Sequence, residues 1–158
     1  MALVNSHGGE GMFEGVGKTK QFKDGAVIFY ENDPGKVMYL IEEGKVRLTR
    51  KSTRETKEIV TTLAVLDPGN FFGEMALFDY GSRSATAMAM GDVRVKMVGR
   101  KDLDDEIKQS PELALDFLDK LSQRLRKTNE LVELLLVREK LAEELYAKVD
   151  ALRSPEFL

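Results

Sequence analysis

The sequence predicts a mainly β fold with some α structure: an antiparallel β-roll or jelly roll followed by a long C-terminal helix. Three observations lead to this prediction. Between Phe22 and Val98 the chain consists of short β-type runs separated by turns. At Gly99 the spacing of apolar residues changes from alternation to a helical period. Between Pro111 and Pro155 no Gly or Pro interrupts the chain.

The 158 residues are expected to divide into four segments. Residues 1–20 are rich in glycine and predict a flexible arm, with a short helical turn around Met12 and Phe13. The single histidine, His7, is interpreted as a residue of that arm, because one histidine cannot build a catalytic metal site. Residues 21–99 form the roll, 100–153 a helical region, and 154–158 a tail.

Within the roll, strands are expected where β-type runs lie between turn signals. The expected runs are 26–30, 37–41, 45–50, 58–66, 86–90 and 92–98. Asp-Pro-Gly turns are expected at 33–35 and 67–69, and in the second of these Pro68 and Gly69 suit the central positions of a type II turn.

The helical region is expected to begin with a short helix, Lys101–Gln109, and to restart at Ser110-Pro111-Glu112. A helix from there to about Arg153 would be roughly 65 Å long, so it either pairs with another chain or bends into two helices. A heptad seam favours a homodimer, although a helix packed wholly on its own roll is the alternative. The seam residues are Leu118, Leu121, Leu125, Thr128, Val132 and Leu135, and after Glu139 the seam resumes at Ala142, Tyr146 and Val149.

Composition argues against several classes of partner. The net charge is −3, and acidic side chains outnumber basic ones from Lys101 to the C-terminus. We therefore expect no direct contact with nucleic acid and none with an anionic membrane. The absence of cysteine excludes disulfides and thiolate metal sites. With no apolar run long enough for a membrane span and no signal peptide, a cytoplasmic protein is expected.

The stretch from Leu66 to Ala87 indicates a pocket for a small anion that also carries hydroxyl groups. Arg83 offers a planar fork of donors suited to phosphate oxygens. Ionised Glu74 only accepts hydrogen bonds and therefore suits a sugar hydroxyl. The turn Gly73–Ala76 can direct backbone N–H groups at the same anion. The alternative is a surface ion pair between Glu74 and Arg83, which would contribute little.

This stretch resembles the phosphate-binding cassette of the cyclic-nucleotide-binding domain family, which includes bacterial cAMP receptor regulators, regulatory subunits of cAMP-dependent kinase and nucleotide-gated channels. The resemblance is carried by Pro68-Gly69, by Phe72 to Phe78, by Gly81 and by Arg83-Ser84-Ala85-Thr86-Ala87. It extends over Phe22 to Val98, where Gly35 to Val46 looks like the family's early hairpin. The ligand-binding residues that it implies are Phe72, Gly73, Glu74, Met75, Ala76, Arg83, Ser84 and Ala85.

The helical region carries part of the resemblance as well. Arg124 to Glu130 resembles the helix of the cAMP receptor regulators in which a Thr and its neighbour contact the adenine, the neighbour coming from the other subunit. This implies Thr128 and Asn129 as base contacts, and the alternative is that Thr128 only fixes helix register. Those regulators follow this helix with a winged helix-turn-helix, which the few residues after Arg153 are too short to form.

The resemblance implies a non-catalytic, allosteric cyclic-nucleotide receptor in signal transduction, binding cAMP or cGMP without a metal and acting on an unidentified downstream protein through the C-terminal helix. Ser84, a hydroxyl residue directly after the arginine, is associated with cGMP in kinase-type relatives, whereas Thr128 favours cAMP. The alternatives are the sensor fragment of a transcription regulator and an oligomeric scaffold whose pocket binds another small anion. A metal-dependent cupin enzyme is a further alternative, but its strands would need clustered histidines.

Overall fold

The computed structural model describes residue 13 and residues 15–79 and 81–152 of the chain. It divides into two compact units, residues 1–113 and 114–158. The expectations for His7, Met12 and the tail at 154–158 lie outside the described residues.

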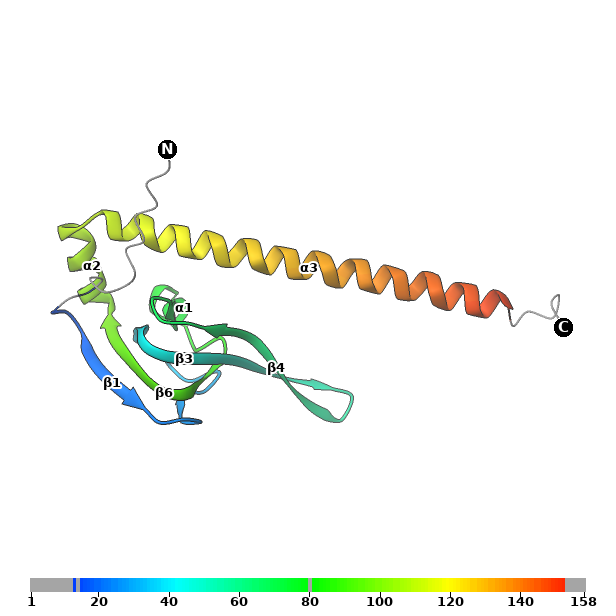
Figure 1. Cartoon of the computed structure of the whole chain (residues 1–158), viewed down its shortest axis with the longest axis horizontal. Helices are drawn as coiled ribbons and strands as arrows, with labels where there is room; N and C mark the ends of the chain where they lie inside the picture. Colours follow the sequence, from blue (N-terminus) through cyan, green and yellow to red (C-terminus); the bar gives the residue numbers. More distant parts are fainter. Residues whose placement is uncertain (1–12, 14, 80, 153–158) are drawn as a thin grey trace. The chain divides into compact units, whose positions relative to one another are not determined.

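The first unit is built on a six-stranded antiparallel sheet, which confirms the predicted fold class. Its order is β1-β6-β3-β4 (Figure 1). In addition, β2 pairs with β6 and β5 pairs with β3. The strands are β1 (Lys18–Phe22), β2 (Val27–Phe29), β3 (Val37–Arg54), β4 (Lys57–Leu66), β5 (Phe71–Phe72) and β6 (Thr86–Gly99). Since β1 begins at Lys18, the last residues of the segment expected as an arm form a strand.

In two places the sequence predicted two consecutive strands where the structure has one long strand. We expected separate strands on either side of Gly44 and of Gly91, but β3 and β6 run through both positions. The ladder between β3 and β6 is irregular from Ile41 to Lys45 and resumes beyond it. Both glycines have a positive φ, 79° and 71°, so each strand bends there without losing its partner.

The turn expected at Asp33-Pro34-Gly35 lies earlier in the chain. The Asp33 amide donates to the Tyr30 carbonyl at 3.2 Å, and Asn32 takes the left-handed position at φ 70°. Pro34 instead forms an isolated bridge to Ser82. The turn at Asp67–Asn70 is as expected, with Gly69 at φ 81° and the Asn70 amide donating to the Asp67 carbonyl.

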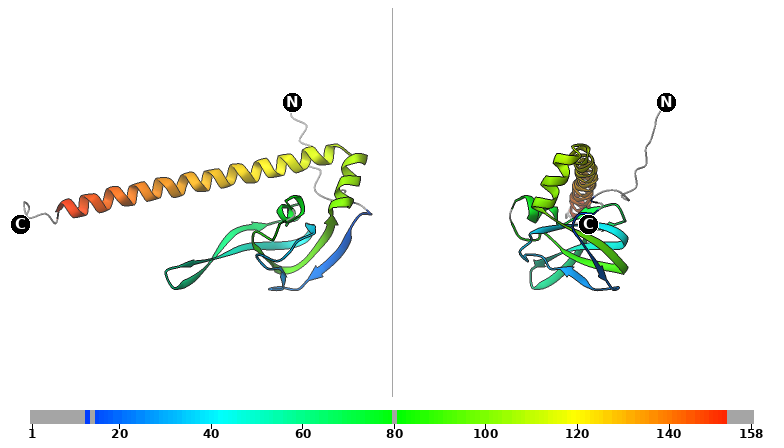
Figure 2. Two further views of the ribbon diagram at one scale, coloured as in Figure 1. Left: turned by 180° about the vertical axis from the view of Figure 1, so that it is seen from behind. Right: turned by 90° about the vertical axis from the view of Figure 1, so that its left-hand side faces the viewer.

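The core of this unit lies between the inward faces of the strands. Its buried apolar cluster includes the three rings Phe29, Tyr39 and Phe72, together with Ile41, Val46, Leu66, Ala87, Ala89, Val93 and Val95. Beyond Thr49, β3 pairs only with β4, and the two project as a two-stranded ribbon (Figure 2). Along β4 the side chains of Ile59, Val60, Leu63 and Val65 are exposed.

The described residues contain three helices: α1 (Glu74–Phe78), α2 (Arg100–Gln109) and α3 (Glu112–Leu152). The bounds of α2 and α3 agree closely with the predicted helices. The long helix is one element of 41 residues and is not broken into two. Most of the predicted seam is exposed: Leu118, Leu125, Val132, Leu135, Tyr146 and Val149. None of the described helices is both long and apolar enough to cross a membrane.

The bend at Gly44 yields a first prediction. A Cβ at Gly44 would lie 2.3 Å from the Asp92 carbonyl oxygen, whereas a Cβ at Gly91 would meet nothing within 4 Å. Both positions impose the left-handed penalty, so we expect Gly91→Ala to cost about 1–2 kcal/mol of unfolding free energy. Gly44→Ala should cost about 1–3 kcal/mol more, because it also overpacks the bend. Urea denaturation of both variants measures the difference, and equal losses would contradict it.

Candidate functional site

The candidate site is built from a turn, a five-residue helix and an extended segment between β5 and β6. Gly73 adopts φ 74° and directly precedes α1, whose first residue is the half-buried Glu74. The chain then reaches Arg83, whose backbone is held on both sides. The Arg83 amide donates to the Asp33 carbonyl and the Asn32 amide donates to the Arg83 carbonyl, each at 2.8 Å. The loop before β3 therefore fixes where the Arg83 side chain starts.

The Arg83 side chain is buried, with only 4% of the residue exposed. Its Nη1 donates to the Gly73 carbonyl at 2.7 Å. Its Nε is also buried and has no hydrogen-bond partner among the described residues. A guanidinium group has five N–H donors, and leaving a buried donor unpaired costs about 1–3 kcal/mol or more. An anion that accepted from this Nε–H would remove that cost.

The electrostatics of the site are dominated by this burial. Burial lowers the pKa of the Arg83 guanidinium, and the nearby Tyr39, Asp33 and Glu74 act in the opposite direction. Burial also raises the pKa of the Tyr39 hydroxyl, which the positive charge of Arg83 partly offsets. The site therefore presents a cation whose environment is poorly hydrated, where an added negative charge interacts more strongly than in water.

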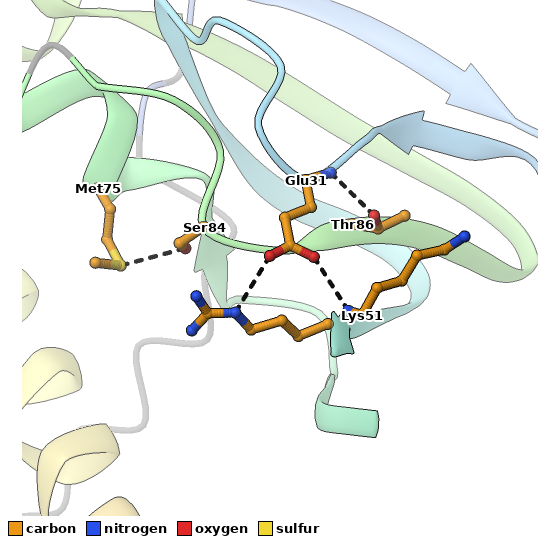
Figure 3. A network of polar contacts seen from close by, with 6 residues as sticks. Glu31, Lys51, Met75, Ser84 and Thr86 are labelled. Carbon is orange, nitrogen blue, oxygen red and sulfur yellow. Dashed lines mark hydrogen bonds and ion pairs between the residues drawn. The ribbon is translucent and has the colours of Figure 1, made fainter. Parts of the chain in front are cut away.

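The rim of the site is more open. Ser84 is exposed, and its Oγ lies 3.4 Å from the Sδ of Met75, which is 54% exposed (Figure 3). On the neighbouring loop, the Glu31 amide donates to Thr86 Oγ1 at 2.9 Å. The Glu31 carboxylate accepts from the Lys51 amide and from Arg50 Nε. These contacts tie the loop before β3 both to the start of β6 and to β3 itself.

The predicted site residues occupy three kinds of position. Gly73, Glu74, Met75 and Ala76 form the turn and start of α1, next to Arg83. The Ala85 side chain and the Phe72 ring are buried, and Phe72 belongs to the core. Thr128 and Asn129 lie in α3, in the second unit, and both are exposed. The Thr128 hydroxyl donates to the Arg124 carbonyl at 3.0 Å.

Sequence reasoning missed three residues that surround the guanidinium. Phe29 and Tyr39 place their rings 4.3 and 5.5 Å from the Arg83 Cζ. Gly35 faces the same group, since a Cβ there would lie 2.6 Å from Arg83 Cζ and Nε. Phe29 and Tyr39 occur in runs that predict ordinary core strands, and Gly35 in a run that predicts a turn, so no local signal marked them.

The part of the chain that the structure describes contains no evident metal-binding site. No group of three or more His, Asp or Glu side chains there could hold a metal ion. The cupin alternative therefore gains no support from the structure.

An antiparallel roll with a buried arginine beside a glycine turn is the arrangement of a cyclic-nucleotide-binding module. The family model for the cyclic nucleotide-binding domain matches residues 19–110, and the chain belongs to this family.

Several regulators are similar to this chain. The cyclic AMP receptor protein of Thermus thermophilus is 37% identical over 132 residues, covering 84% of this chain and 60% of that protein. A cAMP-dependent protein kinase regulatory subunit of Dictyostelium discoideum is 37% identical over 70 residues, which are 44% of this chain and 21% of that protein. The chain thus spans at most about 60% of the length of these relatives.

Solved structures agree with the fold. The crystal structure of Thermus thermophilus catabolite activator protein matches with a TM-score of 0.65 at 38% identity, over 75% of this chain and 55% of that one. The regulatory domain of Toxoplasma gondii PKA with cAMP matches with a TM-score of 0.52 at 29% identity, over 67% of this chain and 38% of that one.

The burial of Tyr39 gives a prediction for the alkaline range. The unfolded chain releases the Tyr39 proton near the ordinary pKa of 10.0, whereas the folded protein holds it to higher pH. The associated stability is therefore complete below pH 10.0 and is lost as the pH rises through the folded-state pKa. We expect Tyr39→Phe to flatten the fall in unfolding free energy above that pH, measured by urea denaturation. Tyr30→Phe, which changes an exposed ring, should keep the wild-type slope. Identical slopes for the wild type and Tyr39→Phe would contradict the prediction.

Proposed function

We propose that this protein is a non-catalytic receptor for a cyclic nucleotide, with cAMP as the first ligand to test. The observation that carries the proposal is the buried Arg83 guanidinium with its unpartnered Nε, in a chain of the cyclic-nucleotide-binding family. A cyclic phosphate would neutralise this charge and supply the missing acceptor.

The other cassette residues receive roles from their chemistry and position. Glu74, at the start of α1, would accept a hydrogen bond from the ribose 2′-hydroxyl. Ser84 is exposed beside Arg83 and would add a hydroxyl donor to the phosphate. The amides of the Gly73–Ala76 turn would assist in binding the same anion. Thr128 and Asn129 are proposed as contacts of the base.

Two considerations bear on the base. Ser84 favours cGMP by its resemblance to kinase-type relatives, and Thr128 favours cAMP. The relatives support cAMP: one is a cyclic AMP receptor protein, and one solved structure is a regulatory domain with cAMP. We therefore infer cAMP as the preferred ligand and cGMP as the competitor.

The output is proposed to pass through α3 in a homodimer. The exposed leucines and valines of the seam would be covered by the same seam of a second copy. A ligand that binds one helix arrangement better than another would shift the population between them and signal to a downstream protein. A sensor role within a transcription regulator is the second candidate, because the similar regulators are longer than this chain.

The role of Arg83 is tested by calorimetric titration with cAMP and cGMP. We expect Arg83→Ala to weaken cAMP binding by roughly a hundredfold or more, because the main charged donor is lost. Arg83→Lys keeps the charge but loses the planar fork, so an intermediate loss is expected. Lys101→Ala removes one positive charge from an exposed site and serves as the control. Unchanged affinity in a folded Arg83→Ala protein would refute the assigned role.

The dimer is tested by light scattering coupled to size exclusion. The wild type should have the mass of two chains, and Val132→Glu combined with Leu135→Glu should yield monomers, because charges would enter the seam. Leu134→Glu is the control: Leu134 is also exposed but lies off the seam, so the dimer should persist. A monomeric wild type, or equal dissociation by the control, would count against the seam.

A further inference from the structure

The Arg83 guanidinium is packed against an aromatic cluster that joins three strands. Phe29 of β2, Tyr39 of β3 and Phe72 of β5 lie with ring centroids 5.1–5.8 Å apart. The guanidinium carbon lies 4.3 Å from the Phe29 ring centroid and 5.5 Å from that of Tyr39. Both distances are within the range of a cation–π interaction. The guanidinium of Arg83 therefore packs directly against two rings of the hydrophobic core.

Two glycines border the same group. A Cβ at Gly35 would lie 2.6 Å from Arg83 Cζ and Nε, and 2.7 Å from the Ala76 Cβ. A Cβ at Gly73 would lie 2.6 Å from Arg83 Nη1. Because neither position has room for a side chain, the space around the guanidinium is a narrow slot. A planar group fits such a slot in few orientations.

The Phe29 face contacts the buried cation without using its donors, whereas the Tyr39 hydroxyl is hydrogen-bonded with the Arg83 side chain. A cation–π contact is stronger when it is shielded from water, and it involves the face of the guanidinium. The N–H groups point outward in the plane of that group, so they stay available for hydrogen bonds. This agrees with the observation that Nη1 donates to Gly73 while Nε remains unpartnered.

We propose that Phe29, Tyr39 and Gly35 are positioning residues that hold Arg83 in the orientation that binds the ligand phosphate. This inference rests on the proposed function and extends it to residues outside the cassette. Phe29 stabilises the charge through the face of its ring, Tyr39 through its ring and a side-chain hydrogen bond, and Gly35 leaves the space for the planar group. Anion affinity is therefore set partly by β2 and by the segment from Gly35 to Tyr39.

The test weakens the negative electrostatic potential on the face of the Phe29 ring while keeping the shape of the ring. Stepwise fluorination of the phenylalanine at position 29 weakens the negative face of the ring with little change in volume. We expect cAMP affinity, measured by calorimetry, to fall with each added fluorine, to about tenfold below wild type for the most fluorinated ring. A purely structural role for Phe29 would leave the affinity unchanged across this series.

Phe22 provides the matched control, because its ring also carries a cation, with Lys20 Nζ at 4.9 Å from the centroid. Fluorination at Phe22 should leave cAMP affinity at the wild-type value.

Phe29→Leu should lower the cAMP affinity about tenfold. Phe29→Tyr should keep it near the wild-type value, since Tyr keeps the aromatic face. Gly35→Ala should also lower it, with Gly99→Ala as the glycine control, where a Cβ comes no nearer than 3.3 Å to a side-chain oxygen.

The outcomes separate this inference from the proposed function. A wild type that binds cAMP, with fluorinated Phe29 variants of equal affinity, overturns the positioning role and leaves the receptor intact. Equal losses from fluorination at Phe22 and Phe29 also overturn it, because the effect would then be general. A wild type that binds neither cAMP nor cGMP overturns the receptor and, with it, this inference.

Discussion

The structure of the site depends on keeping one positive charge inside the protein. Arg83 is almost fully buried, and three different interactions hold it there: backbone pairing with the loop at Asn32 and Asp33, a hydrogen bond to Gly73, and the faces of Phe29 and Tyr39. Each comes from a separate part of the chain. The strand order that places β2, β3 and β5 around this group is therefore what creates the site, and the cassette alone would not.

The same constraint explains the glycines around the site. Gly73 has a positive φ and directs its carbonyl at Arg83, so it determines both the start of α1 and the direction of the side chain. Gly35 has no such backbone requirement, and the guanidinium next to its Cα is the reason that a larger residue does not fit. Two glycines that look alike in the sequence thus serve different purposes.

The sequence predicted the fold class and the helices, and it indicated the cassette as a candidate site, because the signals for all three are local. Arg83, Glu74 and the glycine turn lie in one short stretch, and the long helix shows an uninterrupted period. The prediction that strands end at Gly44 and at Gly91 was wrong, because a residue with a positive φ can bend a strand without interrupting its hydrogen-bonded ladder. Phe29 and Tyr39 could not be found, because their relation to Arg83 exists only after β2 and β3 have paired with the rest of the sheet.

The choice of aromatic rings as partners for the cation has a consequence for binding. A carboxylate in direct contact would also stabilise Arg83, but an anionic ligand would then have to displace it and would lose that energy. The face of Phe29 does not compete for the N–H donors, so an anionic ligand could add its interaction to that of the ring. The buried Arg83 Nε has no hydrogen-bond partner among the described residues, and an anion that accepted from it would remove that penalty. Two terms therefore contribute to the affinity for an anion. One is the new hydrogen bond to Arg83, and the other is the removal of the free-energy penalty of a buried, unpaired donor.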